Sequence, residues 1–203
     1  MDIFTEMNYL AHTLLSGSNE DILLGNFMGD AIKGNKFDHY NNDIQFGVRL
    51  HRFIDNYTDK HPKVLESNQL IRSVFHKFSG VVSDIYFDYF LANNFNKYSS
   101  VSLEEFSQNV YRILKENYDL LPERNKEMVP YMIKQNWLLS YKSLEGMERV
   151  FQGMARRTKF KSNMEEAVQE LYVHQDKLEA CFIPFFEDIK SNCELKISKH
   201  LES

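Results

Sequence analysis

Residues 49–62 read Arg49-Leu50-His51-Arg52-Phe53-Ile54-Asp55-Asn56-Tyr57-Thr58-Asp59-Lys60-His61-Pro62. If this run is helical, His51 and Asp55 lie four residues apart on one face, and Thr58 and Asp59 follow one turn later. An imidazole and carboxylates beside arginines suit a divalent metal and a phosphate. The same spacing also occurs on exposed helices held by ion pairs, so this run alone leaves both interpretations open.

Three further polar pairs with the same spacing interrupt apolar helical segments. They are Asn8 with His12, Asn26 with Asp30, and Asp84 with Asp88. A carboxylate buried without a partner is costly, so several of them on apolar helices favour a shared cation. Helical bundles build metal sites in this way, from polar residues on facing helices. Taken singly, His12 could instead be a hydrogen-bonded core histidine, and Asp84 could be a helix N-cap after Ser83.

Helical periodicity dominates the chain, and no stretch alternates as a strand would. We therefore predict an all-α protein, a single-domain bundle of roughly eight helices over residues 1–203. Helices are expected near 6–15, 18–34, 43–61, 63–77, 81–97, 102–120, up to 137, 143–157 and 163–195. Ser18, Ser102 and Ser143 are the expected N-caps. Pro122 and Pro130 are expected in a connection, and Pro184 is expected to kink or interrupt the last helix.

Composition narrows the class of protein further. The 203 residues are 43% hydrophobic, enough for a substantial core in one domain, and the formal net charge of −5 argues against a general nucleic-acid binder. Cys181 and Cys193 would lie about 18 Å apart on one helix, too far for a disulfide. Reduced cysteines, an N-terminus without a secretory pattern and no membrane-spanning run predict a soluble, cytoplasmic protein with no membrane partner.

Several segments, in order along the chain, resemble the acyl carrier protein phosphodiesterases. They are Asn8-Tyr9-Leu10-Ala11-His12, Gly25-Asn26-Phe27-Met28-Gly29-Asp30, His51-Arg52-Phe53-Ile54-Asp55 with Thr58-Asp59, the Asp84 to Leu91 run, Trp137-Leu138, and Gly153-Met154-Ala155-Arg156-Arg157. The resemblance runs from Met7 to about Lys159, so translation could begin at either Met1 or Met7. It departs from the family pattern at Tyr89, where a histidine is expected after Asp88.

The resemblance implies an HD-like fold and an activity. That family is a divergent branch of the HD-type metal-dependent phosphohydrolases, and the implied reaction is the Mn²⁺-dependent removal of 4′-phosphopantetheine from holo-acyl carrier protein. The expected metal ligands are His12, Asp30, His51, Asp55 and Asp88. Arg52 is expected to hold the phosphate, Asp59 to act as general base or outer ligand, and Asp84 to take part in catalysis or orient a ligand.

The resemblance also implies an acidic protein partner, which an acidic enzyme would repel without a local positive surface. Arg156 and Arg157, in the densest basic cluster, are the expected docking residues, although they could simply interact with a negative helix terminus. Two other functions remain open. The protein could be an HD-type hydrolase of a nucleotide or another small phosphoester, or a helical binding module whose polar pairs are structural.

Overall fold

The computed structural model describes residues 9–202, and helices are the only regular secondary structure in that range. The α-helices are α1 (Tyr9–Leu14), α2 (Glu20–Met28), α3 (Asn42–Thr58), α4 (Pro62–Phe75), α5 (Ser79–Asn93), α6 (Leu103–Glu116), α7 (Glu123–Lys134), α8 (Trp137–Ser140), α9 (Leu144–Arg157) and α10 (Ala167–Leu201). Short 3₁₀ turns lie at Gly29–Ala31, His76–Phe78, Phe95–Lys97, Tyr118–Leu120 and Met164–Glu166. The predicted all-α class is confirmed.

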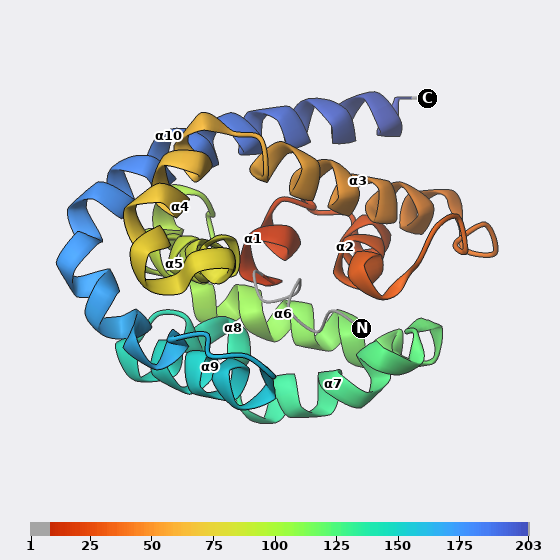
Figure 1. Ribbon diagram of the computed structural model, residues 1–203. Helices are drawn as coiled ribbons and strands as arrows, with labels where there is room; N and C mark the ends of the chain where they lie inside the picture. Colours follow the sequence, from red (N-terminus) through yellow and green to blue (C-terminus); the bar gives the residue numbers. More distant parts are fainter. Residues whose placement is uncertain (1–8, 203) are drawn as a thin grey trace.

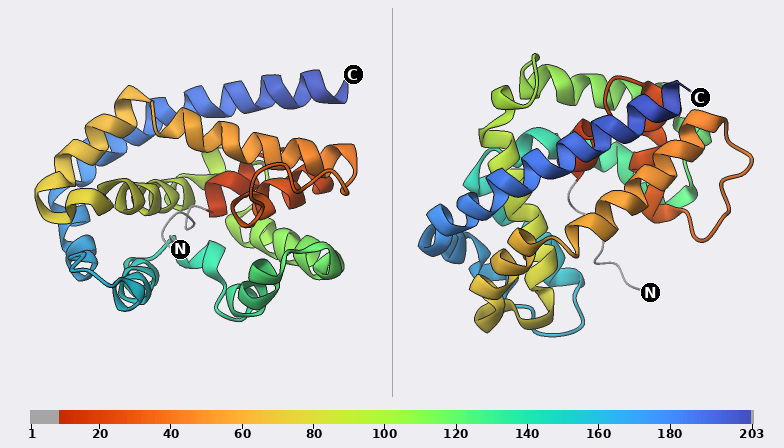
Figure 2. Two further views of the ribbon diagram at one scale, coloured as in Figure 1. Left: turned by 45° about the vertical axis from the view of Figure 1, so that its right-hand side comes forward. Right: turned by 90° about the horizontal axis from the view of Figure 1, so that it is seen from above.

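The helices enclose one hydrophobic core. The short helix α1 lies near the centre and packs against α2 and α5, while α3 and the end of α10 run side by side above it (Figure 1). Both views in Figure 2 show the same pairing of α3 with α10, and the left view shows the arc that α6 to α9 form on the other side. Residues on α1, α2, α3 and α5 therefore meet in the interior, although they are far apart in the sequence.

Two glycines let α2 and α3 approach more closely than ordinary side chains would allow. A Cβ on Gly25 would lie 2.0 Å from the Ile44 carbonyl oxygen, and one on Gly47 would lie 2.2 Å from the Ile22 carbonyl oxygen. Both contacts are too short for any side chain, so larger residues would force the helices apart. The close packing brings the residues that follow each glycine along its helix, Asn26 on α2 and His51 on α3, within reach of each other.

Local capping agrees with the sequence at two helices and differs at a third. Ser102 accepts a hydrogen bond from the Glu105 N–H, and Ser143 accepts one from the Gly146 N–H, as predicted. The N-cap of α2 is Asn19 rather than Ser18, because the Asn19 side chain accepts from the backbone N–H groups of residues 21 and 22. Asparagine and serine cap equally well, so the sequence did not distinguish the two.

The prolines interrupt the helices less than expected. Pro130 lies inside α7, not in a connection, and the Lys126 carbonyl, which lacks the usual N–H partner from position 130, accepts from the Tyr118 hydroxyl at 3.0 Å. Pro184 lies inside α10, which continues through it and curves around the molecule (Figure 1). The two cysteines, Cys181 and Cys193, are free and buried, as expected. None of the helices in residues 9–202 is long and apolar enough to cross a membrane.

Candidate metal centre

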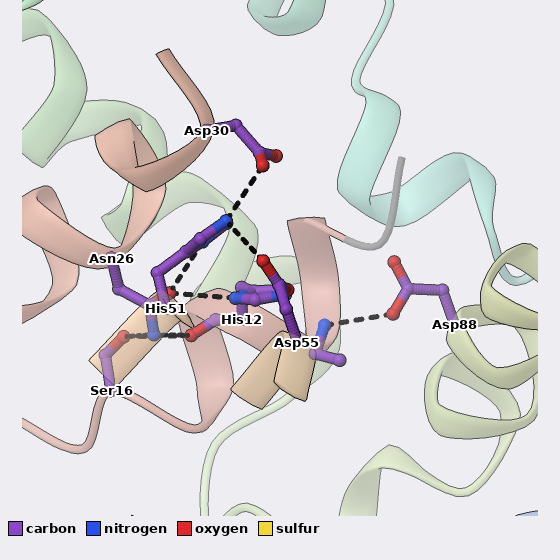
Figure 3. A network of polar contacts seen from close by, with 8 residues as sticks. His12, Ser16, Asn26, Asp30, His51, Asp55 and Asp88 are labelled. Carbon is purple, nitrogen blue, oxygen red and sulfur yellow. Dashed lines mark hydrogen bonds and ion pairs between the residues drawn. The ribbon is translucent and has the colours of Figure 1, made fainter. Parts of the chain in front are cut away.

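Two buried histidines from different helices share one hydrogen-bond acceptor. The Nδ1 atoms of His12 on α1 and His51 on α3 lie 2.8 and 3.2 Å from the side-chain oxygen of Asn26 on α2. The Asn26 amide nitrogen donates to the His12 carbonyl and to the Ser16 hydroxyl, both at 2.9 Å, which fixes the orientation of the amide. Each imidazole therefore carries a proton on Nδ1 and directs Nε2 to the opposite side (Figure 3).

Carboxylates lie where the two Nε2 atoms converge. One oxygen of Asp55 is 3.3 Å from His12 Nε2, the other is 3.2 Å from His51 Nε2, and an oxygen of Asp30 is 3.0 Å from His51 Nε2. The histidine side chains are 3% and 6% exposed, whereas Asp30 is 17% and Asp55 is 42% exposed. The cluster is therefore open to solvent on its carboxylate side and closed behind the imidazoles.

This donor set fits a divalent cation. One ligand atom from each of His12, His51 and Asp55 lies within 4.8 Å of the others. Both Nε2 atoms are buried without a hydrogen-bond partner in residues 9–202, because the nearby carboxylate oxygens have ion-pairing distances but not hydrogen-bonding directions. Buried polar atoms are seldom left unsatisfied, and a cation between them would take up both lone pairs. Imidazole and carboxylate ligands accept several divalent metals, so the donor set alone does not fix the ion.

In the absence of a metal ion, a proton on His51 offsets the negative charge of the neighbouring carboxylates. Burial lowers the pKa of His51, but the adjacent carboxylates of Asp30 and Asp55 outweigh it and raise that pKa to about 10. Burial likewise raises the pKa of Asp55, and the two histidines outweigh it and hold that pKa well below its ordinary value. A metal would therefore replace a proton on the His51 imidazole rather than enter a neutral cavity.

Asp84 and Asp59 lie around this cluster. Asp84 is inside α5, not at its N-cap, and lines a small cavity beside the site together with Thr58 and Asp88. Burial, with the charges of Asp55, Asp59 and Asp30, raises the pKa of Asp84 to about 7. Asp59 is exposed at the C-terminal end of α3. The structure thus brings both residues within electrostatic range of the cluster, and their catalytic roles stay predictions.

Asp88 occupies a different position from the one expected of a metal ligand. Its two oxygens accept hydrogen bonds from the backbone N–H groups of Leu10 and Ala11, at 3.1 and 2.9 Å, at the start of α1. Burial raises its pKa well above the ordinary value. Figure 3 shows Asp88 apart from the histidine cluster. In this arrangement Asp88 holds the helix that carries His12, and direct metal ligation by Asp88 stays a prediction.

Arg52, the predicted phosphate ligand, contacts the loop that follows Asp30. One terminal nitrogen donates to the carbonyls of Ile32 and Gly34, and the guanidinium lies 5.1 Å from the centre of the Phe37 ring. Arg52 therefore holds this loop beside the cluster. Binding a phosphate would require Arg52 to exchange these carbonyl contacts for the phosphate oxygens.

The remaining predicted residues fall in three places. Arg156 and Arg157 end α9 and line a surface hollow. Tyr89 contacts Phe90, with ring centres 5.5 Å apart. Asn8, the predicted partner of His12, lies outside the described residues.

The role of Asn26 was not predicted from the sequence, although its four-residue spacing from Asp30 was. The signal that could have identified it is a fully buried amide on an otherwise apolar helix, since such a group needs several hydrogen-bond partners. Gly29 was also missed. A Cβ there would lie 2.2 Å from the His51 ring, so this glycine leaves the space that the imidazole occupies.

The fold and the site define a helical protein with a buried histidine–carboxylate cluster that can hold a divalent cation. A family model described as "Acyl carrier protein phosphodiesterase" matches residues 7–189. A protein of that name from Photorhabdus laumondii subsp. laumondii is 31% identical over 191 residues, covering 94% of this chain and 96% of the relative. One from Escherichia coli strain K12 / DH10B is 29% identical over 195 residues, covering 94% and 99%.

The chain therefore belongs to the acyl carrier protein phosphodiesterase family, as its resemblance indicated. No solved structure matches it, so the relationship to HD-type folds stays a prediction.

Proposed function

We propose that this protein is a metal-dependent phosphodiesterase that removes 4′-phosphopantetheine from holo-acyl carrier protein and leaves the apo protein. The observation that carries the proposal is the convergence of two buried Nε2 atoms on Asp55 in a chain that belongs to this family over most of its length. We propose Mn²⁺ as the ion, held by His12, His51 and Asp55 with Asp30 as a further ligand. A bound divalent ion would neutralise the phosphodiester and lower the pKa of an attacking water.

The residues of the chain then have separate tasks. Asn26 holds both imidazoles with Nε2 free, and the exposed side of Asp55 leaves an approach for the substrate. Hydrolysis adds water to phosphorus and breaks the bond from phosphorus to the serine oxygen of the carrier protein, which must gain a proton. Asp84, with a pKa near 7, can exchange a proton near neutral pH, and Asp59 lies at the exposed end of the same helix as Asp55.

Intact-mass analysis of a purified acyl carrier protein tests this proposal. The holo form is incubated with the enzyme after removal of metal, with and without added Mn²⁺. We expect loss of the phosphopantetheine mass only with metal, and retention of that mass with Asp55→Asn. A wild-type enzyme that leaves holo-carrier protein intact, but hydrolyses nucleotides or small phosphodiesters, would contradict the proposed substrate. Equal activity of Asp55→Asn would contradict the proposed site.

A further inference from the structure

The small cavity beside the histidine–carboxylate cluster is mostly apolar. It lies between α1, α3, α5 and α10, and four phenylalanine rings from α5 and α10 form much of its wall: Phe87, Phe182, Phe185 and Phe186. Its free volume of about 20 Å³ slightly exceeds the roughly 10–15 Å³ that one water molecule needs. The cavity is therefore suited to a methyl-sized part of a ligand, not to a chain or a ring.

Two residues that line the cavity are direct neighbours of expected metal ligands. Ala11 precedes His12 on α1, and Ile54 precedes Asp55 on α3. Figure 3 shows Asp55 on the side of the histidines toward Asp88, which also lines the cavity. A ligand whose phosphate is held at the cluster can therefore reach the cavity with the first carbons beyond its phosphate.

The Thr58 hydroxyl is an unpaired polar group in this apolar cavity. Thr58 lies one turn after Asp55 on α3, is 9% exposed and lines the cavity. Within residues 9–202 its hydroxyl forms no hydrogen bond, whereas each of the other buried serine and threonine hydroxyls takes part in at least one. Buried hydroxyls are seldom left unsatisfied, so this one points to a polar group on a ligand that enters the cavity.

We propose that this cavity is a subsite for the first carbons of the phosphopantetheine arm, an inference that rests on the proposed function. In 4′-phosphopantetheine the phosphate ester is followed by a methylene, then by a carbon that bears two methyl groups, and then by a carbon that bears a hydroxyl. A methyl group can enter between the phenylalanine rings, and the ligand hydroxyl can pair with Thr58. Simple alkyl phosphodiesters lack this branch, so the cavity favours the arm over them.

Calorimetry with product-like phosphate monoesters tests the subsite without hydrolysis. Mn²⁺-loaded wild type is titrated with ethyl phosphate, with neopentyl phosphate, which adds the methyl branch, and with 4′-phosphopantetheine, which also adds the hydroxyl. We expect neopentyl phosphate to bind on the order of tenfold more tightly than ethyl phosphate. Ala11→Leu, which fills the cavity, should remove that preference. Ala155→Leu, at a partly buried alanine on α9 outside the cavity, should keep it.

Thr58→Val tests the hydroxyl separately. The change keeps the shape of the side chain, so it tests the subsite even if Ala11→Leu does not fold. It should weaken binding of 4′-phosphopantetheine about fivefold and leave the affinity for neopentyl phosphate unchanged, because only the former ligand carries a hydroxyl. Thr158→Val is the control, since the Thr158 hydroxyl donates to the Met154 carbonyl and does not line the cavity.

The outcomes separate the subsite from the proposed function. Equal affinity of wild type for ethyl and neopentyl phosphate, binding of neither, or a preference that survives in a folded Ala11→Leu would overturn the inference. Thr58→Val that binds 4′-phosphopantetheine like wild type would overturn the role of the hydroxyl and show that water alone satisfies it. Loss of the arm from holo-carrier protein without any preference for neopentyl phosphate would refute only the subsite. A clear preference in an enzyme that leaves holo-carrier protein intact would support an apolar subsite and refute the proposed function.

Discussion

Substitution of Gly29 by alanine should damage the metal centre through steric contact alone. The backbone at Gly29 is right-handed helical, with φ of −50°, so alanine fits the backbone without strain. Its Cβ would, however, lie 2.2 Å from Cγ, 2.5 Å from Cβ and 2.6 Å from Cδ2 of His51. Carbon atoms pack at about 3.5 Å or more, so the His51 side chain, including its Cβ, must move by roughly 1.3 Å. That shift would break the 3.2 Å contact from Nδ1 to Asn26 and displace Nε2 from Asp55.

The expected cost is large and measurable. Misplacement of a reacting group by about 1 Å can reduce a rate about 100-fold, and loss of the contact that orients a ligand typically weakens metal binding about 10- to 100-fold. Mn²⁺ affinity and hydrolysis of a small phosphodiester should both fall by these factors in Gly29→Ala. Gly80→Ala is the control, because its nearest neighbour to a new Cβ is 4.0 Å away.

A double variant distinguishes the clash from general unfolding. In Gly29→Ala/His51→Gly both the ring and the Cβ of residue 51, which would lie 2.5 Å from the new Cβ, are gone, so thermal stability should recover relative to Gly29→Ala while metal binding stays lost. Wild-type Mn²⁺ affinity in a folded Gly29→Ala would refute the steric reasoning. Additive losses of stability in the double variant would do so too.

Three further predictions concern the surroundings of the cluster. Asn26→Ala should weaken Mn²⁺ binding about 10- to 100-fold by titration, whereas Ser16→Ala, which removes a partner on the other side of the same amide, should not; equal effects would contradict the role of the amide oxygen. Asp88→Ala should lower the free energy of unfolding by about 1–3 kcal/mol for each N–H left unpaired at α1, measured by denaturant titration, while Asp88→Asn keeps part of it; no loss in either would refute the capping role. The pKa of His51 is raised to about 10 in the folded state, so its contribution to the stability of the metal-free protein is complete below about pH 6.5 and is lost as pH rises toward 10; melting curves should show this decline in wild type, and a decline of the same size in His51→Gln would contradict its assignment to His51.

The parts of the site that could be predicted depend on local spacing. His51 and Asp55 follow from the four-residue repeat within one helix, because that repeat places two side chains on one face whatever surrounds them. The repeat was less reliable for Asp84 and Asp88. Residues four apart on a helix are separated by about 6 Å along its axis, so each can meet a different neighbour. Asp84 lies within electrostatic range of Asp55 and Asp30, whereas Asp88 accepts hydrogen bonds from the first turn of α1.

The parts that could not be predicted depend on how helices meet. Asn26 joins His12 and His51 only because α1, α2 and α3 converge, and the sequence gives each helix without its partners. The close approach of α2 and α3 at Gly25 and Gly47 could not be predicted for the same reason, since the sequence does not show which backbone packs against a glycine in a helix. The fold class could be predicted because helical periodicity extends through the whole chain. The position of Pro130 inside a helix could not, because the Lys126 carbonyl that the proline leaves without its usual partner accepts from the hydroxyl of Tyr118, which lies outside that helix.

Anomalous diffraction from a crystal of the protein soaked in Mn²⁺, measured at the manganese edge, tests the central claim most directly. We predict an anomalous peak within coordination distance of His12 Nε2, His51 Nε2 and an oxygen of Asp55, with both Nδ1 atoms still on Asn26. A peak held by other residues, or full Mn²⁺ occupancy with either imidazole turned away from the ion, would contradict the account.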